Sequence, residues 1–360
     1  MEISRNVNIK EVGRKSLGVL IIPAIVILAV LIYCWSTNQM ILTTKSGFNE
    51  FTRYTAVIFI TTIALSINLG SGRFDFSLGS MATLSSIISA KITYAMLSGS
   101  GASASVMLVI SILAGAILGA LSGALYVALK LPPIITSLGV TLIYEGLAFV
   151  ITKGIDIKSE IDNASMTFFK TNWWIHIIII VVILAVIYLV FDRSKFGYNY
   201  KALRAGQKIS VDTGIKEIPN AIICYAICGA LMGVVGFLQA LPGNYIDSSV
   251  LNFGSIGIMF TAFLPMFIGG YIGRFSNDKV GYLLAAVTMS FISSMFQLKT
   301  FVESSASASV QSILTALLLV FFLIFLNNEE TCKSLVNGTL IKKWIREYKE
   351  RKAKRAEENK

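Results

Sequence analysis

Long stretches without charged residues recur along the chain at intervals that suit membrane helices. Residues 17–35 and 309–326 contain no charged side chain, and residues 174–191 read WIHIIIIVVILAVIYLVF. A helix that crosses the hydrocarbon core of a bilayer needs about 20 such residues. The pattern predicts an all-α integral membrane protein with about ten transmembrane helices, at 17–35, 54–70, 78–97, 104–128, 134–152, 174–191, 218–240, 253–272, 280–298 and 309–326.

Two polar, glycine-containing stretches interrupt this pattern and indicate broken helices. INLGSGRFDFSLGS covers residues 67–80, and PGNYIDSSVLNFGS covers residues 242–255. The span at 253–272 contains Gly and Pro and would also suit a re-entrant segment. Each stretch leads into a short helix and then two longer spans, which suggests an inverted repeat of the kind found in transporters. Small residues are common in all membrane helices, so the spacing also fits a chain without a repeat.

The distribution of Lys and Arg predicts the orientation. The chain carries 31 Lys and Arg against 20 Asp and Glu, a net charge of +11. Basic residues concentrate in cytoplasmic segments of membrane proteins, and here they gather in segments 1–16, 192–217 and 327–360. We therefore expect a cytoplasmic N-terminal segment (1–16), a transmembrane domain (17–326) and a basic cytoplasmic tail (327–360). The net positive charge is therefore explained by the cytoplasmic segments of a protein in the lipid bilayer, and we expect no nucleic-acid partner.

The segment GSGRFDFSLGS (70–80) holds the first candidate chemistry. Arg73 and Asp75 stand between two apolar helices, with Ser77 and Ser80 beside them. Ionisable groups in a membrane are costly and usually functional, and a glycine-permitted break exposes backbone polar groups to a path. These four residues are therefore candidates for the translocation pathway. A cytoplasmic turn, with Asp75 or Ser77 capping the next helix, explains the same residues.

The segment KLPPIITSLGVTLIYEG (130–146) holds the second group of candidate functional residues. Two prolines open its helix, which places Thr136 and Ser137 in the first turn and Glu145 deeper in an apolar span. A carboxyl group at that position needs a proton or a cation, and Arg73 is the candidate cation. Thr136, Ser137 and Glu145 join the candidate pathway.

The third segment, GYNYKALRAGQKISVDTGI (197–215), lies within the largest predicted cytoplasmic loop and is basic. A transporter driven by a separate ATPase subunit would need a rigid cytoplasmic element that receives the movement of that subunit, and this segment could provide it. On charge alone, an ordinary cytoplasmic loop is the better explanation of this segment.

Three stretches together resemble the ribose-type permeases of ABC transporters, within the broad family that includes branched-chain amino acid permeases. They are GRFDFSLGS (72–80), SGALYVALKLPPIITSLGVTLIYEG (122–146) and the 197–215 loop followed by YAICGALMGVVGFLQA. The chain departs from the family pattern at Arg73, where Gly is usual, and at Glu145, where Arg is frequent. Gln207 and Lys208 replace the usual Asn and Glu. The first two departures suggest a charge swap across one contact.

The resemblance implies an importer permease that works as a homodimer or heterodimer in the plasma membrane. It implies a cytoplasmic ATPase partner, which would bind the ATP, and an extracytoplasmic solute-binding protein. No G-x-x-x-x-G-K-[ST] phosphate-binding motif occurs in the sequence, and we expect no cofactor, metal or catalytic residue in this chain. The resemblance implies ATPase coupling by Ala205, Gly206, Gln207, Lys208, Asp212, Thr213 and Gly214.

Other interpretations remain open from the residues, including a channel, although the sequence lacks a repeated polar ring or a filter-like stretch. The main alternative is a secondary transporter driven by an ion gradient through Asp75 or Glu145. A membrane enzyme is disfavoured by a single histidine and by the lack of a paired carboxylate motif or metal-ligand cluster in the sequence. A sugar, a nucleoside and a related small polar solute all suit the importer.

Overall fold

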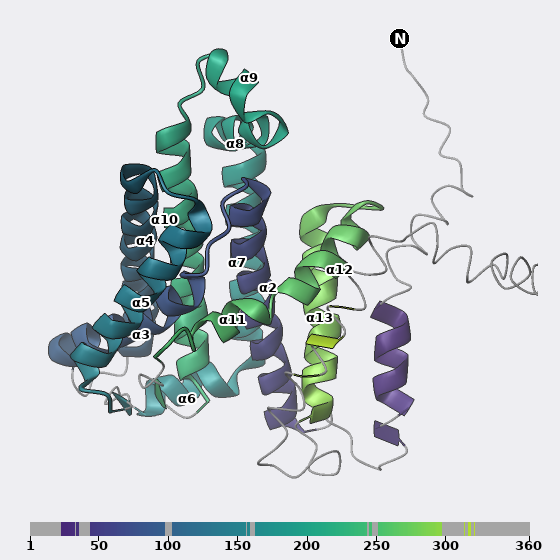
Figure 1. The fold of residues 1–360 in the computed structure, drawn as a ribbon. Helices are drawn as coiled ribbons and strands as arrows, with labels where there is room; N and C mark the ends of the chain where they lie inside the picture. The colour runs from purple at the N-terminus through teal and green to yellow at the C-terminus, as the bar shows by residue number, and fades with distance from the viewer. Residues whose placement is uncertain are drawn as a thin grey trace, which may run out of the picture. The chain divides into compact units, whose positions relative to one another are not determined.

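The computed structural model describes residues 23–32, 34–35, 44–97, 103–155, 157–158, 163–242, 245–246 and 251–296, with the helical residues 313, 316, 317 and 320. The chain forms two compact units, Met1–Ala308 and Ser309–Lys360, and every element below belongs to the first. A helix at Pro23–Ile32 comes first. The elements that follow (Figure 1) are α2 (Lys45–Gly70), α3 (Leu78–Leu97), α4 (Ser103–Leu129), α5 (Pro133–Thr152), β1 (Ile157–Lys158), α6 (Asn163–Thr171), α7 (Trp173–Asp192), α8 (Lys195–Ala205), α9 (Gln207–Asp212), α10 (Glu217–Ala240), β2 (Tyr245–Ile246), α11 (Ile256–Phe260), α12 (Phe263–Gly273) and α13 (Asp278–Phe296).

The predicted helical membrane class is confirmed. Within the described residues, six helical segments are long and apolar enough to cross a membrane: α2, α4, α5, α7, α10 and the interrupted pair α11–α12. Seven of the eight spans predicted between residues 54 and 298 each overlap one helix, and the eighth, 253–272, overlaps the interrupted pair α11–α12. The count of ten and the cytoplasmic placement of both termini stay predictions, because segments 1–16 and 327–360 and most of the span 309–326 lie outside the described residues.

The centre of the bundle is the close pairing of α4 with α10. A Cβ atom added to Gly115 would lie 2.2 Å from the Gly229 carbonyl oxygen, and one added to Gly229 would lie 2.1 Å from the Gly115 oxygen. The Ser111 hydroxyl donates to the Gly233 carbonyl across the same contact, at 2.7 Å. Small residues allow such approach between membrane helices, where dispersion and interhelical hydrogen bonds provide the attraction.

Helix α2 runs antiparallel to α10 and begins nine residues earlier than the predicted start at 54. The Thr44 side chain caps it by accepting a hydrogen bond from the Gly47 amide. Near its start, Arg53 Nη1 donates to the Leu238 carbonyl, and further along, Cys228 Sγ donates to the Ala64 carbonyl. These contacts establish the register between the two helices.

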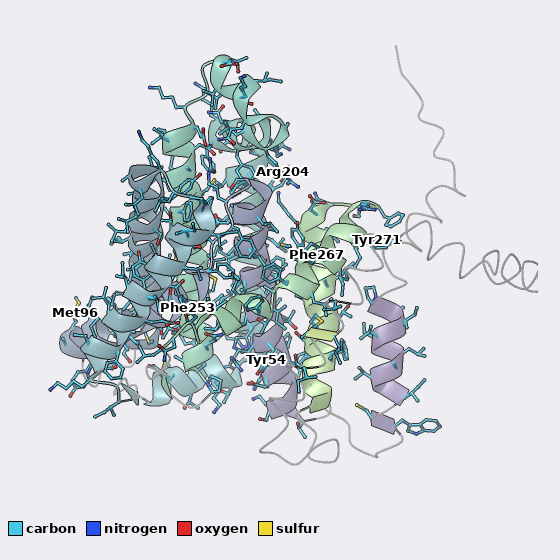
Figure 2. The ribbon with its side chains drawn as sticks, in the orientation of Figure 1. Tyr54, Met96, Arg204, Phe253, Phe267 and Tyr271 are labelled. Atoms are coloured by element: carbon cyan, nitrogen blue, oxygen red, sulfur yellow. The ribbon has the colours of Figure 1, made fainter. Side chains whose placement is uncertain are left out.

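The register distinguishes two ends of the bundle. Helices α8 and α9 lie where α10 begins, and we call this the α8–α9 end; α6 lies at the opposite end (Figure 1). Lys279 of α13 forms an ion pair with Asp192, the last residue of α7. The β1–β2 pair joins the α5–α6 connection to the α10–α11 connection. Figure 2 shows Arg204 and Tyr54 toward opposite ends of α2.

Candidate functional site

The break between α2 and α3 is held by a buried carboxyl group. Asp75 Oδ1 accepts hydrogen bonds from the Ser77 amide at 2.8 Å and from the Ser77 hydroxyl at 2.6 Å. This is the Asx-turn arrangement that starts many helices. The Ser77 carbonyl accepts from the Met81 amide, and the Ser80 hydroxyl donates back to the same carbonyl at 2.9 Å. Asp75, Ser77 and Ser80 therefore lie together at the start of α3, where Asp75 caps the helix as the alternative interpretation expected. Their place in the translocation pathway stays a prediction.

This break lies well inside the bundle rather than at its surface. Asp75 Oδ2 accepts from Asn68 Nδ2 at 3.2 Å, and Asn68 Oδ1 lies 3.3 Å from Cys228 Sγ. Cys228 stands eleven residues beyond Glu217, the first residue of α10, which is about 16 Å along the helix axis. The described structure therefore favours a broken helix that enters the bundle over a surface turn.

Glu145 of α5 holds the segment that precedes α11. Its Oε2 accepts from the Phe253 amide at 3.0 Å, and its Oε1 accepts from the Ser255 amide at 3.0 Å and the Ser255 hydroxyl at 2.6 Å. Glu145 is only 2% exposed. A single buried carboxyl group thus satisfies three donors of a non-helical stretch that would otherwise lie unpaired.

The two broken segments meet. A Cβ atom added to Gly79, in the first turn of α3, would lie 1.9 Å from the Ser255 carbonyl oxygen. Beside this contact, phenylalanines from both segments pack in a chain. The Phe74 ring centroid lies 5.7 Å from that of Phe263, and the Phe76 centroid lies 6.3 Å from that of Phe260. The meeting of the two breaks, with its polar residues, is called the break site below.

The suggested charge swap between Arg73 and Glu145 is wrong. Arg73 Nη2 donates to Glu217 Oε1 at 3.3 Å, at the start of α10, whereas Glu145 is occupied by Phe253 and Ser255. Arg73 is 4% exposed, and its Nη1 atom has no hydrogen-bond partner in the described structure. Glu217 Oε1 also accepts from Gln207 Nε2. Arg73 therefore connects the α2–α3 break with α9 and α10.

Thr136 and Ser137 are buried but make only local hydrogen bonds. The Thr136 hydroxyl donates to the Pro132 carbonyl at 3.4 Å and the Ser137 hydroxyl donates to the Ile134 carbonyl at 2.9 Å. Both lie on the buried stripe of α5 that also carries Glu145. Thr136 and Ser137 therefore lie on the same face of α5 as Glu145, which contacts the break site, but their own hydroxyls donate locally, to Pro132 and Ile134.

The predicted coupling residues lie on an exposed pair of short helices at the α8–α9 end. Ala205 ends α8, Gly206 separates the helices, and Gln207, Lys208 and Asp212 belong to α9. The Thr213 hydroxyl donates to the Ser210 carbonyl, and Gly214 has a φ of +92°, which favours glycine. Ile209 is 73% exposed and Val211 is 42% exposed.

Helix α8 is anchored to the end of α2. The buried Tyr200 hydroxyl donates to the Ile67 carbonyl at 2.8 Å. A Cβ atom added to Gly70 would lie 2.9 Å from that hydroxyl oxygen and 3.6 Å from the Arg204 guanidinium. The exposed helices are thus bound to the residues that immediately precede the break.

Several residues of this arrangement escape sequence reasoning. Asn68, Ser255 and Glu217 each contact a predicted residue. Asn68 is the one amide side chain in the predicted span 54–70, and that signal could have identified it. Cys228 also lies in the hydrogen-bonded network beside Asp75, through the Asn68 amide oxygen.

Comparison with known proteins decides the family. The family model for the permease component of branched-chain amino acid transport systems matches residues 47–323, which include α2 to α13 apart from the first two residues of α2. The chain belongs to that family. It is a transport permease and not an enzyme, and the predicted resemblance is confirmed.

Several curated transport permeases match the chain at low identity. The chain is 24% identical over 245 residues to the autoinducer 2 import system permease protein LsrC of Photorhabdus luminescens, covering 66% of this chain and 70% of LsrC. It is 27% identical over 243 residues to the fructose import permease protein FruF of Bifidobacterium longum, covering 63% and 62%. It is 24% identical over 207 residues to the nucleoside ABC transporter permease protein NupB of Lactococcus lactis, covering 52% and 54%. No solved structure matches the chain.

Proposed function

We propose that this permease is the membrane-spanning subunit of an ATP-driven ABC importer for a sugar, a nucleoside or a related small polar solute. It works as a dimer in the plasma membrane. A separate cytoplasmic ATPase binds the α8–α9 end, and an extracytoplasmic binding protein delivers solute to the opposite end. The relatives that import fructose or nucleosides support the solute class.

The exposed α8–α9 pair carries the proposal. Ile209 and Val211 are apolar and exposed at the tip, whereas Tyr200 and Glu217 bind its base to residues 67 and 73 of the break region. An element that is exposed at one end and bonded to a helix break at the other can transmit movement between them. The basic residues of this loop support a cytoplasmic location, because Lys and Arg concentrate in cytoplasmic segments of membrane proteins.

The proposed pathway runs beside the break site. Asp75, Ser77, Ser80, Thr136, Ser137 and Glu145 are all buried polar residues on the elements that surround it. Rocking of α2 through α8 would shift the break and open this polar region alternately to either side. The ion-driven alternative has no equivalent support, because the carboxyl oxygens of Asp75 and Glu145 are occupied by fixed donors.

Purification of the tagged chain with its ATPase partner tests the proposal. We expect a stoichiometric ATPase, identified by mass spectrometry, whose hydrolysis is stimulated by the loaded binding protein. Ile209→Ser should release the ATPase without loss of the folded permease, because the side chain is exposed and makes few internal contacts. Lys195→Ser, a change to Ser at an exposed position of the neighbouring helix α8, is the control. Transport under an ion gradient by the permease alone would refute the proposal.

A further inference from the structure

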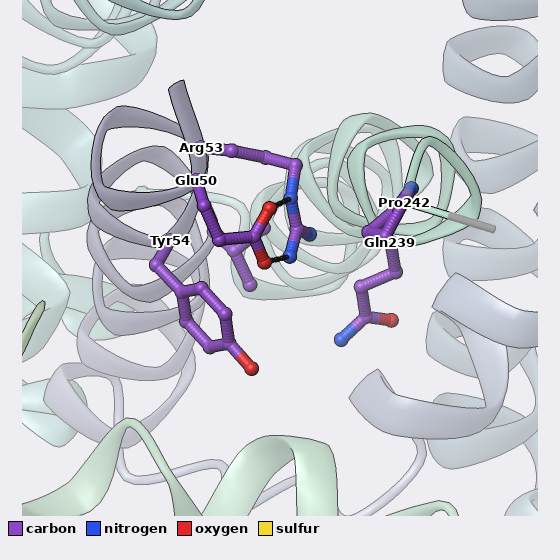
Figure 3. A pocket seen from close by; sticks show the side chains of 6 residues that line it. Glu50, Arg53, Tyr54, Gln239 and Pro242 are labelled. Carbon is purple, nitrogen blue, oxygen red and sulfur yellow. Dashed lines mark hydrogen bonds and ion pairs between the residues drawn. The ribbon is translucent and has the colours of Figure 1, made fainter. Parts of the chain in front are cut away.

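A second polar site lies away from the break site, at the end of the bundle opposite α8–α9. A cavity of about 330 Å³ is lined by Glu50, Arg53, Tyr54 and Val57 of α2 with Gln239 and Pro242 at the end of α10 (Figure 3). We call it the entry pocket. Its volume falls at the small end of the range typical of small-molecule sites.

The floor of the entry pocket is a fixed ion pair. Arg53 is 6% exposed, and its Nε and Nη2 atoms donate to the two oxygens of Glu50. Its Nη1 atom donates to the Leu238 carbonyl at 3.0 Å. All three guanidinium nitrogens are therefore engaged, and the pair is held in one geometry with little net charge. Bidentate pairs of this kind are rigid, and the Glu50 oxygens keep lone pairs that can accept further hydrogen bonds.

Two uncommitted polar groups face this floor. The Tyr54 hydroxyl and the Gln239 amide point into the pocket, beside the Arg53–Glu50 ion pair (Figure 3). Both side chains are half-buried, and neither has a hydrogen-bond partner within the described residues. Together they offer a hydroxyl, an amide donor and an amide acceptor. The Arg53 guanidinium lies 4.9 Å from the Tyr54 ring centroid, which holds that ring in place.

We propose that the entry pocket is a subsite for a neutral polyhydroxylated solute, a sugar or the ribose of a nucleoside, on its way into the permease. The proposal rests on the function proposed above. Vicinal hydroxyls donate and accept at once, which matches the mixture of the Glu50 lone pairs, the Tyr54 hydroxyl and the Gln239 amide. The neutralised floor gives a charged solute no counter-charge. Fixed groups lower the ordering cost of binding.

The test uses the full chain in lipid nanodiscs and saturation-transfer NMR with D-fructose, L-arabinose and adenosine, with D-ribose 5-phosphate as the charged probe. Tyr54→Phe with Gln239→Met removes the free polar groups but keeps size, ring and the Arg53–Glu50 pair. We expect binding of a neutral solute to weaken about tenfold or more, as two hydrogen bonds would. Tyr94→Phe, a hydroxyl removed from an exposed tyrosine of α3, should leave binding unchanged.

Unfolding temperatures equal to that of the wild type confirm that both variants are folded. Unchanged neutral-solute binding in the double variant would overturn the subsite, as would no neutral binding to the wild type or tighter binding of the phosphate. Co-purification of an ATPase with the same chain reports separately on the importer. A subsite failure with the ATPase present therefore leaves the proposed function standing.

Discussion

Removal of the Glu145 carboxyl group should free the segment before α11. Glu145→Ala leaves the amides of Phe253 and Ser255 without their acceptor. A buried donor left unpaired costs about 1–3 kcal/mol, so the two amides together set a scale of about 2–6 kcal/mol. The Ser255 hydroxyl can rotate to another acceptor and contributes less.

Amide hydrogen exchange measures this loss directly. A local destabilisation of about 3 kcal/mol corresponds to roughly a hundredfold faster exchange at Phe253 and Ser255, since about 1.4 kcal/mol is tenfold. Ser255→Ala removes only the hydroxyl donor and should accelerate exchange at Phe253 far less. Thr136→Ala, on the same helix face, is the control, because its hydroxyl bonds only within α5.

Unaltered exchange at both amides in Glu145→Ala would refute this reasoning. It would mean that the carboxyl group does not hold the segment and that packing between Gly79 and Ser255 is sufficient. Equal acceleration in Glu145→Ala and Thr136→Ala would instead indicate a general loosening of α5.

Three further outcomes are expected. Gly229→Val should destabilise the folded chain by about 1–3 kcal/mol or more, because the backbone of α4 occupies the space that the new side chain needs. Thermal unfolding in detergent measures this loss. Gly139→Val is the control and should be tolerated, because the space around the Gly139 Cβ position is open. Arg73→Ala and Glu217→Ala should each lower solute-stimulated ATPase activity, and the double variant should be no worse than the more severe single variant, since both remove one pair; multiplied losses would contradict this. Gly206→Trp should uncouple ATPase activity from transport with expression intact, because only Ile209 lies near its Cβ position; normal coupling would count against ATPase binding at α9.

The sequence alone determined the helical membrane class and most helix positions. Helix α3 occupies the predicted range 78–97, and α10 begins one residue before the predicted 218. These boundaries are local properties, because a helix in lipid satisfies its backbone hydrogen bonds within itself and needs only an apolar run of sufficient length. The family could also be recognised from ordered local motifs, and the match over residues 47–323 confirms it.

Only the tertiary structure decided which polar groups meet. Arg73 and Glu217 are 144 residues apart, and Glu145 and Ser255 are 110 apart. Arg53 lies one residue before the predicted span 54–70, yet it is buried within α2 and donates to the Leu238 carbonyl in the second half of the chain. A hydrophobic pattern reports where a helix can form but not how two helices rotate and register against each other. That choice depends on close contacts such as Gly115 with Gly229, and it determines every long-range pair of the break site and the entry pocket.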